Sequence, residues 1–229
     1  MTSLQKWGKS VRTTIPVMAG YLVLGAGFGI LLRTRGYGLG WALAMSAFIY
    51  AGSMQYVAID LLTGGASLLT TAVTTLLVNA RHLFYGISML ERYRAAGKYA
   101  PYLIFSLTDE TYSLVAAHED LTGAECFRIS LLDQLYWVLG TALGSLAGAY
   151  LDFKTTGIDF SLTALFLTVF TEQWLETKDH APALIGLGVS IVCRLLFGAD
   201  SFLLPTMGGM LCCLLVLDAR RTKKGGESV

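Results

Sequence analysis

Charged residues are scarce in this chain: Asp, Glu, Lys and Arg make up 14% of its 229 residues, and the net charge is +1. A soluble domain carries nearly twice that charged fraction. The hydrophobic residues, 54% of the chain, form runs of about 17–25 residues, the length that crosses a bilayer core. The composition therefore excludes an ordinary soluble domain. It predicts an all-α polytopic membrane protein that contacts the lipid bilayer and no nucleic acid.

Cysteine and the common nucleotide- and metal-binding motifs are also in short supply. The sequence has four cysteines and no CxxC pair, and three of the four stand in apolar runs, as small packing residues do. It contains neither a GxxxxGK[ST] loop for ATP nor an H-E-x-x-H zinc motif. We therefore expect no disulfide framework, no metal site and no cofactor.

Hydrophobic segments follow one another along the chain, at roughly 15–32, 41–62, 66–90, 99–117, 129–150, 158–176, 181–198 and 201–217. Because the connections are short, we expect one membrane-embedded domain over residues 1–229, with short cytoplasmic tails at about 1–14 and 218–229. Both tails and the loops at 33–40 and 91–98 are positively charged, and simple alternation of eight spans cannot place all of them in the cytoplasm. Two counts stay open: eight spans, or seven spans with one re-entrant segment.

Glycines are concentrated in two of these segments. The first segment holds Gly20, Gly25, Gly27 and Gly29. That pattern suits either a closely packed helix or a broken, re-entrant one. The fifth segment holds Gly140, Gly144 and Gly148, spaced four apart so that they share one helix face. Such a face predicts close packing against another helix, of this subunit or of a partner.

Polar side chains stand at the centres of three apolar segments. They are Ser53 and Gln55, next to Gly52, in 41–62; Asn79, Arg81, His82 and Tyr85 in 66–90; and Asp109, Glu110 and Tyr112 in 99–117. Each central charge costs about 2.5–3.5 kcal/mol on insertion scales, so the three charged residues would cost on the order of 8–10 kcal/mol against lipid. They must face the protein interior or a water-filled cavity, and we expect Arg81 within salt-bridge reach of Asp109 or Glu110. A purely structural ion pair stays open as an alternative.

Three other acidic residues of the apolar segments lie near segment ends: Asp60, Asp133 and Glu172. Charged groups at such depths can be solvated among lipid headgroups. We therefore expect these three to be solvated and to form no site.

Four stretches together resemble the AzlC-type (LIV-E) family of branched-chain amino-acid permeases: FIYAGSMQYVA, TTLLVNARHLFYGISM, FSLTDETYSLV and GIDFSLTALFLTV. The N-x-R-H-x-x-Y-G and T-D-E elements are specific in combination, and the resemblance covers almost the whole chain. It implies an inner-membrane exporter of leucine, isoleucine and valine, and of methionine in some members. The exporter would be the large subunit of a two-component system with a small membrane partner of the AzlD type. Thr163 stands where we would expect a proline, which leaves the shape of the sixth segment in question.

The chemistry of an amino acid indicates the same residues. Arg81 offers a planar fork for the carboxylate, Asp109 or Glu110 can pair with the ammonium, and N–H groups at a helix break near Gly52 and Ser53 would add to carboxylate binding. The predicted substrate-binding residues are Gly52, Ser53, Gln55, Asn79, Arg81, Tyr85 and Tyr112. His82, Asp109 and Glu110 form the predicted coupling network, in which a carboxyl group carries a proton. Phe48, Tyr56, Phe84 and Tyr112 are candidates for an apolar wall.

Three other functions stay open. Ser53, His82 and Asp109 could form an intramembrane hydrolytic triad, but AGSMQ lacks the second glycine of a G-x-S-x-G nucleophile motif. We therefore expect no enzyme. A passive channel and a transporter of another solute are the remaining alternatives.

Overall fold

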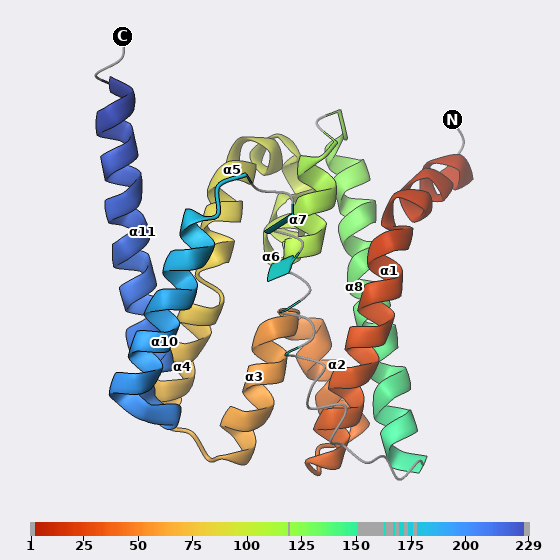
Figure 1. The fold of residues 1–229 in the computed structure, drawn as a ribbon. Helices are drawn as coiled ribbons and strands as arrows, with labels where there is room; N and C mark the ends of the chain where they lie inside the picture. The colour runs from red at the N-terminus through yellow and green to blue at the C-terminus, as the bar shows by residue number, and fades with distance from the viewer. Residues whose placement is uncertain are drawn as a thin grey trace. The chain divides into compact units, whose positions relative to one another are not determined.

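The computed structural model describes residues 3–118, 120–150, 163, 167, 170–171, 174–175 and 178–226. Its elements there are α-helices and one short 3-10 helix, which confirms the predicted all-α class for the described part (Figure 1). The chain divides into two compact units, Met1–Thr163 and Ala164–Val229, and each is described by itself. The single domain expected from the short connections stays a prediction.

Two long helices form the frame of the first unit. α1 (Ser3–Thr34) and α8 (Gly123–Tyr150) run side by side (Figure 1). A Cβ atom added at Gly25 would lie 2.8 Å from the Trp137 carbonyl oxygen, and one at Gly140 would lie 2.7 Å from the Leu22 carbonyl oxygen. The glycines thus let the two backbones touch. The predicted packing of the fifth segment is confirmed, and the first segment is an unbroken helix, so its re-entrant alternative is wrong.

The three segments that carry central polar residues are each divided into two helices. They are α2 (Leu39–Phe48) and α3 (Gly52–Thr63), α4 (Leu68–Val78) and α5 (Arg81–Ala95), and α6 (Ala100–Phe105) and α7 (Asp109–Ala116), the last pair preceded by η1 (Gly97–Tyr99). The expected break near Gly52 is confirmed; the other two breaks were not expected. The predicted segments 41–62, 66–90 and 99–117 therefore each contain two short helices.

Local backbone geometry explains where the helices stop. Tyr50 has a φ of 42°, a left-handed conformation that is unusual for a tyrosine. Asn79 ends α4 at φ −92° and ψ 4°. Thr108 is extended, and its hydroxyl accepts a hydrogen bond from the Thr111 N–H at 3.2 Å, which caps the start of α7. Each break thus lies directly before a group of polar residues.

Two apolar clusters fill the first unit. One joins α1, α2, α3 and α8 through residues such as Phe28, Leu32, Ile59 and Trp137, and the other joins α5, α6, α7 and α8. Among the described residues, two helical stretches are long and apolar enough to cross a membrane unaided, Gln5–Thr34 and Ala181–Gly198. The count of seven or eight spans stays a prediction.

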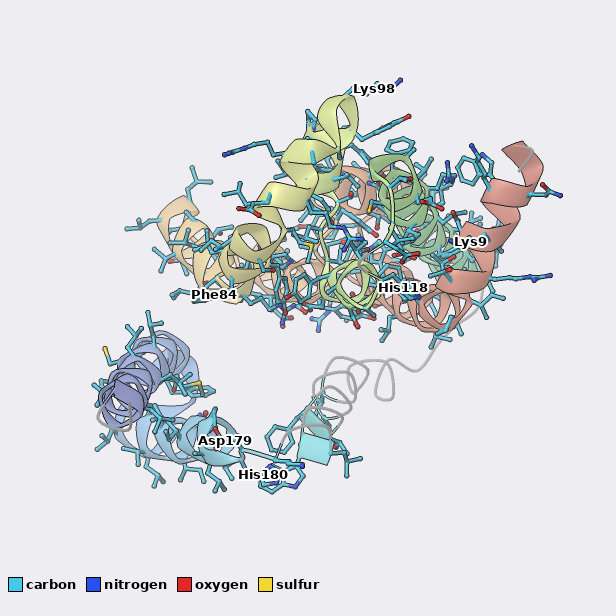
Figure 2. All side chains as sticks on the ribbon, turned by 90° about the horizontal axis from the view of Figure 1, so that it is seen from above. Lys9, Phe84, Lys98, His118, Asp179 and His180 are labelled. Carbon is cyan, nitrogen blue, oxygen red and sulfur yellow. The ribbon has the colours of Figure 1, made fainter. Side chains whose placement is uncertain are left out.

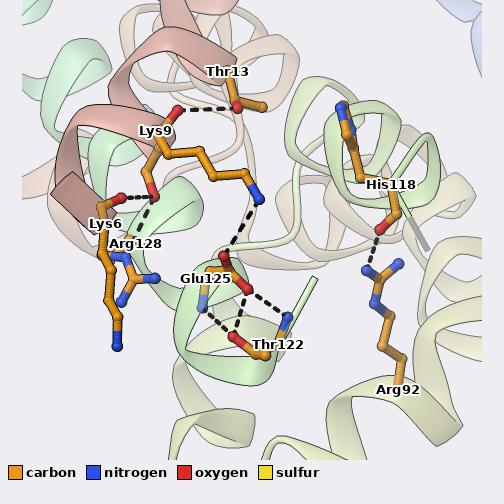
Figure 3. Close-up of polar contacts among 9 residues, drawn as sticks. Lys6, Lys9, Thr13, Arg92, His118, Thr122, Glu125 and Arg128 are labelled. Carbon is orange, nitrogen blue, oxygen red and sulfur yellow. Dashed lines mark hydrogen bonds and ion pairs between the residues drawn. The ribbon is translucent and has the colours of Figure 1, made fainter. Parts of the chain in front are cut away.

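Polar contacts hold the start of α8 against α1 and cap the end of α7 (Figure 3). Thr122 and Glu125 form a capping box: the Glu125 N–H donates to the Thr122 hydroxyl at 3.3 Å, and the Thr122 N–H donates to the Glu125 carboxylate at 3.0 Å. These bonds, with the Thr122 hydroxyl as a further donor, lower the pKa of Glu125. Lys9 pairs with Glu125 at 3.7 Å. Arg92 donates to the carbonyl oxygens of Val115 and His118 at the end of α7.

The second unit contains α10 (Ala181–Ser201) and α11 (Leu203–Gly226), which match the predicted seventh and eighth segments. A Cβ added at Gly209 would lie 3.0 Å from a methyl group of Val189, so the two helices pack closely. Arg194, four residues before the end of the predicted segment, lies over the ring of Phe202 at 5.4 Å. The predicted sixth segment, with Glu172, lies mostly outside the described residues.

Candidate functional site

Three helices of the first unit begin at one place. α3 begins at Gly52, α5 at Arg81 and α7 at Asp109. The Arg81 Nη2 atom lies 2.7 Å from the Asp109 Oδ2 atom and donates to the Ser53 hydroxyl at 3.0 Å. One guanidinium nitrogen thus connects all three helix starts. The predicted proximity of Arg81 to an acidic residue is confirmed, and the partner is Asp109.

Three polar atoms of the ion pair and of Asn79, two residues before Arg81, are buried without a hydrogen-bond partner among the described residues. They are the Arg81 Nε atom, the Asp109 Oδ1 atom and the Asn79 Oδ1 atom. The first is a donor and the other two are acceptors. The Arg81 and Asp109 side chains nevertheless remain 35% and 38% exposed. The junction therefore contains one unpaired donor atom and two unpaired acceptor atoms.

Aromatic side chains lie beside the ion pair. The Tyr85 and Tyr112 rings stack with their centroids 4.4 Å apart and a 14° angle between planes. The Ser88 hydroxyl donates to the Tyr112 oxygen at 3.2 Å, and Tyr85 interacts electrostatically with Asp109 and Arg81. Two of the predicted substrate-binding residues thus form a flat apolar surface next to the charged groups.

His82 packs against α4 and Tyr85. Its Nδ1 atom lies 3.2 Å from the Asn79 carbonyl oxygen, and its ring meets Tyr85 edge-on at 5.8 Å. Asp109 and Arg81 both act on it electrostatically. Because the Ser53 hydroxyl accepts from Arg81 and the His82 Nδ1 atom is engaged with Asn79, these side chains are not arranged as a hydrolytic triad.

Glu110 and Asp133 belong to the packing between α7, α1 and α8. Tyr21 donates to the Glu110 Oε2 atom at 2.7 Å, and Thr111 donates to the Asp133 Oδ2 atom at 2.9 Å. Asp133 is completely buried, so its expected solvated position was wrong. Asp60 is exposed, as expected. Sequence reasoning missed Tyr21 altogether, because a tyrosine in an apolar helix carries no signal by itself.

Gln55 and Gly52 contact neighbouring helices of the first unit. Gln55 is fully buried; its amide donates to Ser46 at 3.1 Å and accepts from the Trp137 N–H at 2.9 Å. A Cβ at Gly52 would lie 3.0 Å from the Trp137 ring. These contacts fix α3 against α2 and α8 and leave no face of Gln55 open, which disagrees with its predicted contact with substrate.

The other predicted wall residues are either buried in another contact or largely exposed. Tyr56 is buried and donates to the Leu24 carbonyl oxygen at 2.7 Å. Phe48 and Phe84 are 80% and 64% exposed, and Figure 2 shows Phe84 at the edge of the first unit. Of the four predicted wall residues, Tyr112 alone lies beside the ion pair.

Comparison with known proteins places the chain among membrane proteins of one family. A family model described as AzlC protein matches residues 16–151. The branched-chain amino acid transport protein AzlC of Bacillus subtilis (strain 168) is 46% identical over 209 residues, covering 89% of this chain and 82% of that protein. An uncharacterized membrane protein of Haemophilus influenzae is 42% identical, with 92% and 87% covered. The inner membrane protein YgaZ of Escherichia coli is 26% identical, with 90% and 87% covered. No solved structure matches the chain.

Proposed function

This chain belongs to the AzlC family, and from that premise we propose that it carries branched-chain amino acids across the inner membrane. The substrates are leucine, isoleucine and valine, with methionine as a further candidate. The proposed binding site is the junction of α3, α5 and α7, where Arg81, Asp109 and Asn79 hold the charged groups of the amino acid.

The observation that carries this proposal is the set of unpartnered atoms at the junction. Arg81 Nε is an unused donor, and Asp109 Oδ1 and Asn79 Oδ1 are unused acceptors. An amino acid presents a carboxylate that needs donors and an ammonium that needs acceptors. Buried polar groups are nearly always paired. A zwitterion supplies an acceptor for the unpaired donor and a donor for the unpaired acceptors, which an apolar or singly charged solute does not.

The surroundings favour the same solute. The starts of helices carry partial positive charge from the aligned peptide dipoles, and half-helix starts hold anionic groups of substrates in other transporters. The stacked rings of Tyr85 and Tyr112 offer an apolar surface for a branched side chain. Ser53 and Asp109 hold the guanidinium, so its unpaired Nε edge is oriented before the substrate binds.

Substrate analogues test this assignment directly in proteoliposomes. Leucinamide lacks the carboxylate, and 4-methylpentanoate lacks the ammonium. Each should compete with leucine on the order of a hundredfold more weakly, because each leaves a buried partner unpaired. Arg81→Lys and Asp109→Asn should weaken leucine binding, while exposed Arg94→Lys and Asp60→Asn serve as matched controls. If both analogues competed as strongly as leucine itself, a zwitterion site would be rejected.

The direction of transport, its coupling and its partner form the finer part of the proposal. We expect export driven by the proton gradient, with this chain as the large subunit beside a small AzlD-type membrane protein. Leucine release from preloaded vesicles should need an imposed pH difference and both subunits. Equal release from vesicles that hold this chain alone would reject an obligate partner. Flux that does not saturate and persists without any gradient would indicate a channel. Saturable flux of other solutes without leucine would indicate another substrate.

A further inference from the structure

A line of hydroxyl groups connects two carboxyl groups inside the first unit. From one end, the contacts are Glu110 Oε2 to the Tyr21 oxygen at 2.7 Å and the Tyr21 oxygen to Thr108 Oγ1 at 2.6 Å. They continue from Thr108 Oγ1 to Thr111 Oγ1 at 3.1 Å and from Thr111 Oγ1 to Asp133 Oδ2 at 2.9 Å. All four separations fall in or close to the range of O–H···O hydrogen bonds.

The hydroxyl groups of this line supply fewer protons than the line has contacts. Tyr21, Thr108 and Thr111 supply one hydroxyl proton each, which makes three protons for four contacts. If both carboxyl groups were ionised, one contact would join two oxygens with no proton between them. A fourth proton, carried by Glu110 or by Asp133, completes the line. The hydrogen-bond geometry therefore favours one protonated carboxyl group shared between the two ends.

Burial supports the same count. Asp133 is completely buried, Thr111 is its hydrogen-bond donor, and its Oδ1 atom has no partner among the described residues. No Lys or Arg of the described residues lies within ion-pair distance of Asp133. A buried carboxylate with one donor and no cation is strongly disfavoured. A second ionised carboxyl group at the other end would add repulsion.

The groups that face the two ends differ in charge. Glu110 is influenced by Tyr21 of α1, Tyr50 at the α2–α3 break, Asp109 of α7 and Arg81 of α5. Asp133 is influenced by Glu110, by Tyr50 and by Tyr102 of α6. The Asp109 carboxylate and the Arg81 guanidinium act on Glu110 with opposite signs, so the ion pair does not fix the proton at either end of the line.

We propose that Asp133 is a proton-binding residue of the transport cycle, and that Tyr21, Thr108 and Thr111 relay its proton to and from Glu110 beside the substrate junction. The inference deepens the proposed function, since it rests on proton-coupled transport. For one transfer toward Asp133, Glu110 gives its proton to Tyr21, Tyr21 to Thr108, Thr108 to Thr111, and Thr111 to Asp133. Four O–H bonds break and four form, so one proton moves and no other reactant is needed.

Infrared spectroscopy of the purified, substrate-free protein tests the shared proton without any transport. The wild type should show the carbonyl band of one protonated buried carboxyl group at neutral pH. Asp133→Asn places an amide N–H donor at the end of the line and thereby completes it, so the band should vanish. Glu110→Gln should abolish it for the same reason. No band in the wild type, or a remaining band in either variant, would overturn the shared proton.

Transport measurements test the relay. Thr111→Val and Tyr21→Phe remove one hydroxyl each and keep the shape of the side chain. Both should lower proton-driven leucine transport about tenfold or more, while leucine exchange without a gradient stays within about twofold of wild type. Thr111→Ser keeps the hydroxyl and should restore coupled transport. Tyr56→Phe is the matched control, because the hydroxyl of this buried tyrosine contacts a backbone carbonyl.

Two outcomes would overturn the relay. Full proton-driven transport in Thr111→Val and Tyr21→Phe would show that no proton passes through these hydroxyls. If Thr111→Val and Tyr21→Phe lost exchange and coupled transport equally, and Thr111→Ser restored neither, the line would be purely structural. If the wild type carries no leucine at all, the proposed function fails. The infrared bands of the wild type, Asp133→Asn and Glu110→Gln still decide whether the two carboxyl groups share a proton.

Discussion

The contact between α1 and α8 is the part of the fold most sensitive to a single added atom. A Cβ at Gly144 would overlap the carbonyl of Ala26 and lie 2.5 Å from its Cα atom. Ordinary contact begins at 3.4 Å, so the helices must separate by more than about 0.9 Å, because the carbonyl oxygen lies nearer than the Cα atom. Overpacking of this kind costs up to about 3 kcal/mol. The higher helix propensity of alanine returns roughly 1 kcal/mol. We therefore expect Gly144→Ala to destabilise the protein by about 2 kcal/mol.

Thermal unfolding of the purified protein measures this effect. A loss of about 2 kcal/mol should lower the Tm by about 4–8 °C in a chain of this size. Gly20→Ala is the matched control, because it lies on α1 with open space around its Cβ position, and it should not lower the Tm. The reasoning is refuted if Gly144→Ala and Gly20→Ala have the same Tm. Coupled transport should also fall in Gly144→Ala, since Tyr21 on α1 must stay 2.7 Å from Glu110.

Three further predictions concern the site and its supports. Asp109→Asn should lower the Tm more than Arg81→Gln, and the double variant should recover part of the loss. Thr122→Ala should cost about 1 kcal/mol at neutral pH. Because the folded pKa of Glu125 is lowered, its stabilising bonds are present above the unfolded pKa and are lost as the pH falls through the folded value, so melting curves of this variant and wild type should converge in acid. Gln55→Leu should cost about 1–3 kcal/mol and leave the KM for leucine within about twofold; a raised KM at unchanged Tm would restore Gln55 as a substrate contact.

The helical class and the pairing of Arg81 with one of the two acidic residues Asp109 and Glu110 were predictable because each depends on a large cost. Apolar runs long enough to span a bilayer leave few alternatives, and an unpaired central charge is too costly to leave against lipid. The spacing of Gly140 and Gly144 predicted close packing against another helix; that this helix is α1 came from the structure.

The helix breaks and the buried network were not predictable in the same way. No glycine or proline lies at the α4–α5 or α6–α7 break, and the α2–α3 break passes through Tyr50 in a left-handed conformation. Tertiary contacts therefore override local helix propensity there. Asp133 lies near a segment end in sequence, yet it is completely buried and accepts a hydrogen bond from Thr111 of α7. Its burial depends on which helices pack around it, and, unlike a central charge, a carboxyl near a segment end gives no signal of that packing.

The position of Arg81 explains why Asp109 should matter more for stability than Arg81 itself. Arg81 is the first residue of α5, where the helix dipole disfavours a positive charge by about 0.3–1 kcal/mol. Asp109 is the first residue of α7, where the same effect favours a negative charge. Asp109→Asn leaves a half-buried cation against a helix start with Ser53 as its remaining partner, whereas Arg81→Gln leaves an anion that its own helix still stabilises. A double-mutant cycle on the Tm should therefore show Asp109→Asn as the costlier single change, with a favourable coupling between the two sites. If Arg81→Gln proved costlier, the helix starts would contribute little to the charge balance, and the case for carboxylate binding at this junction would rest on Arg81 alone.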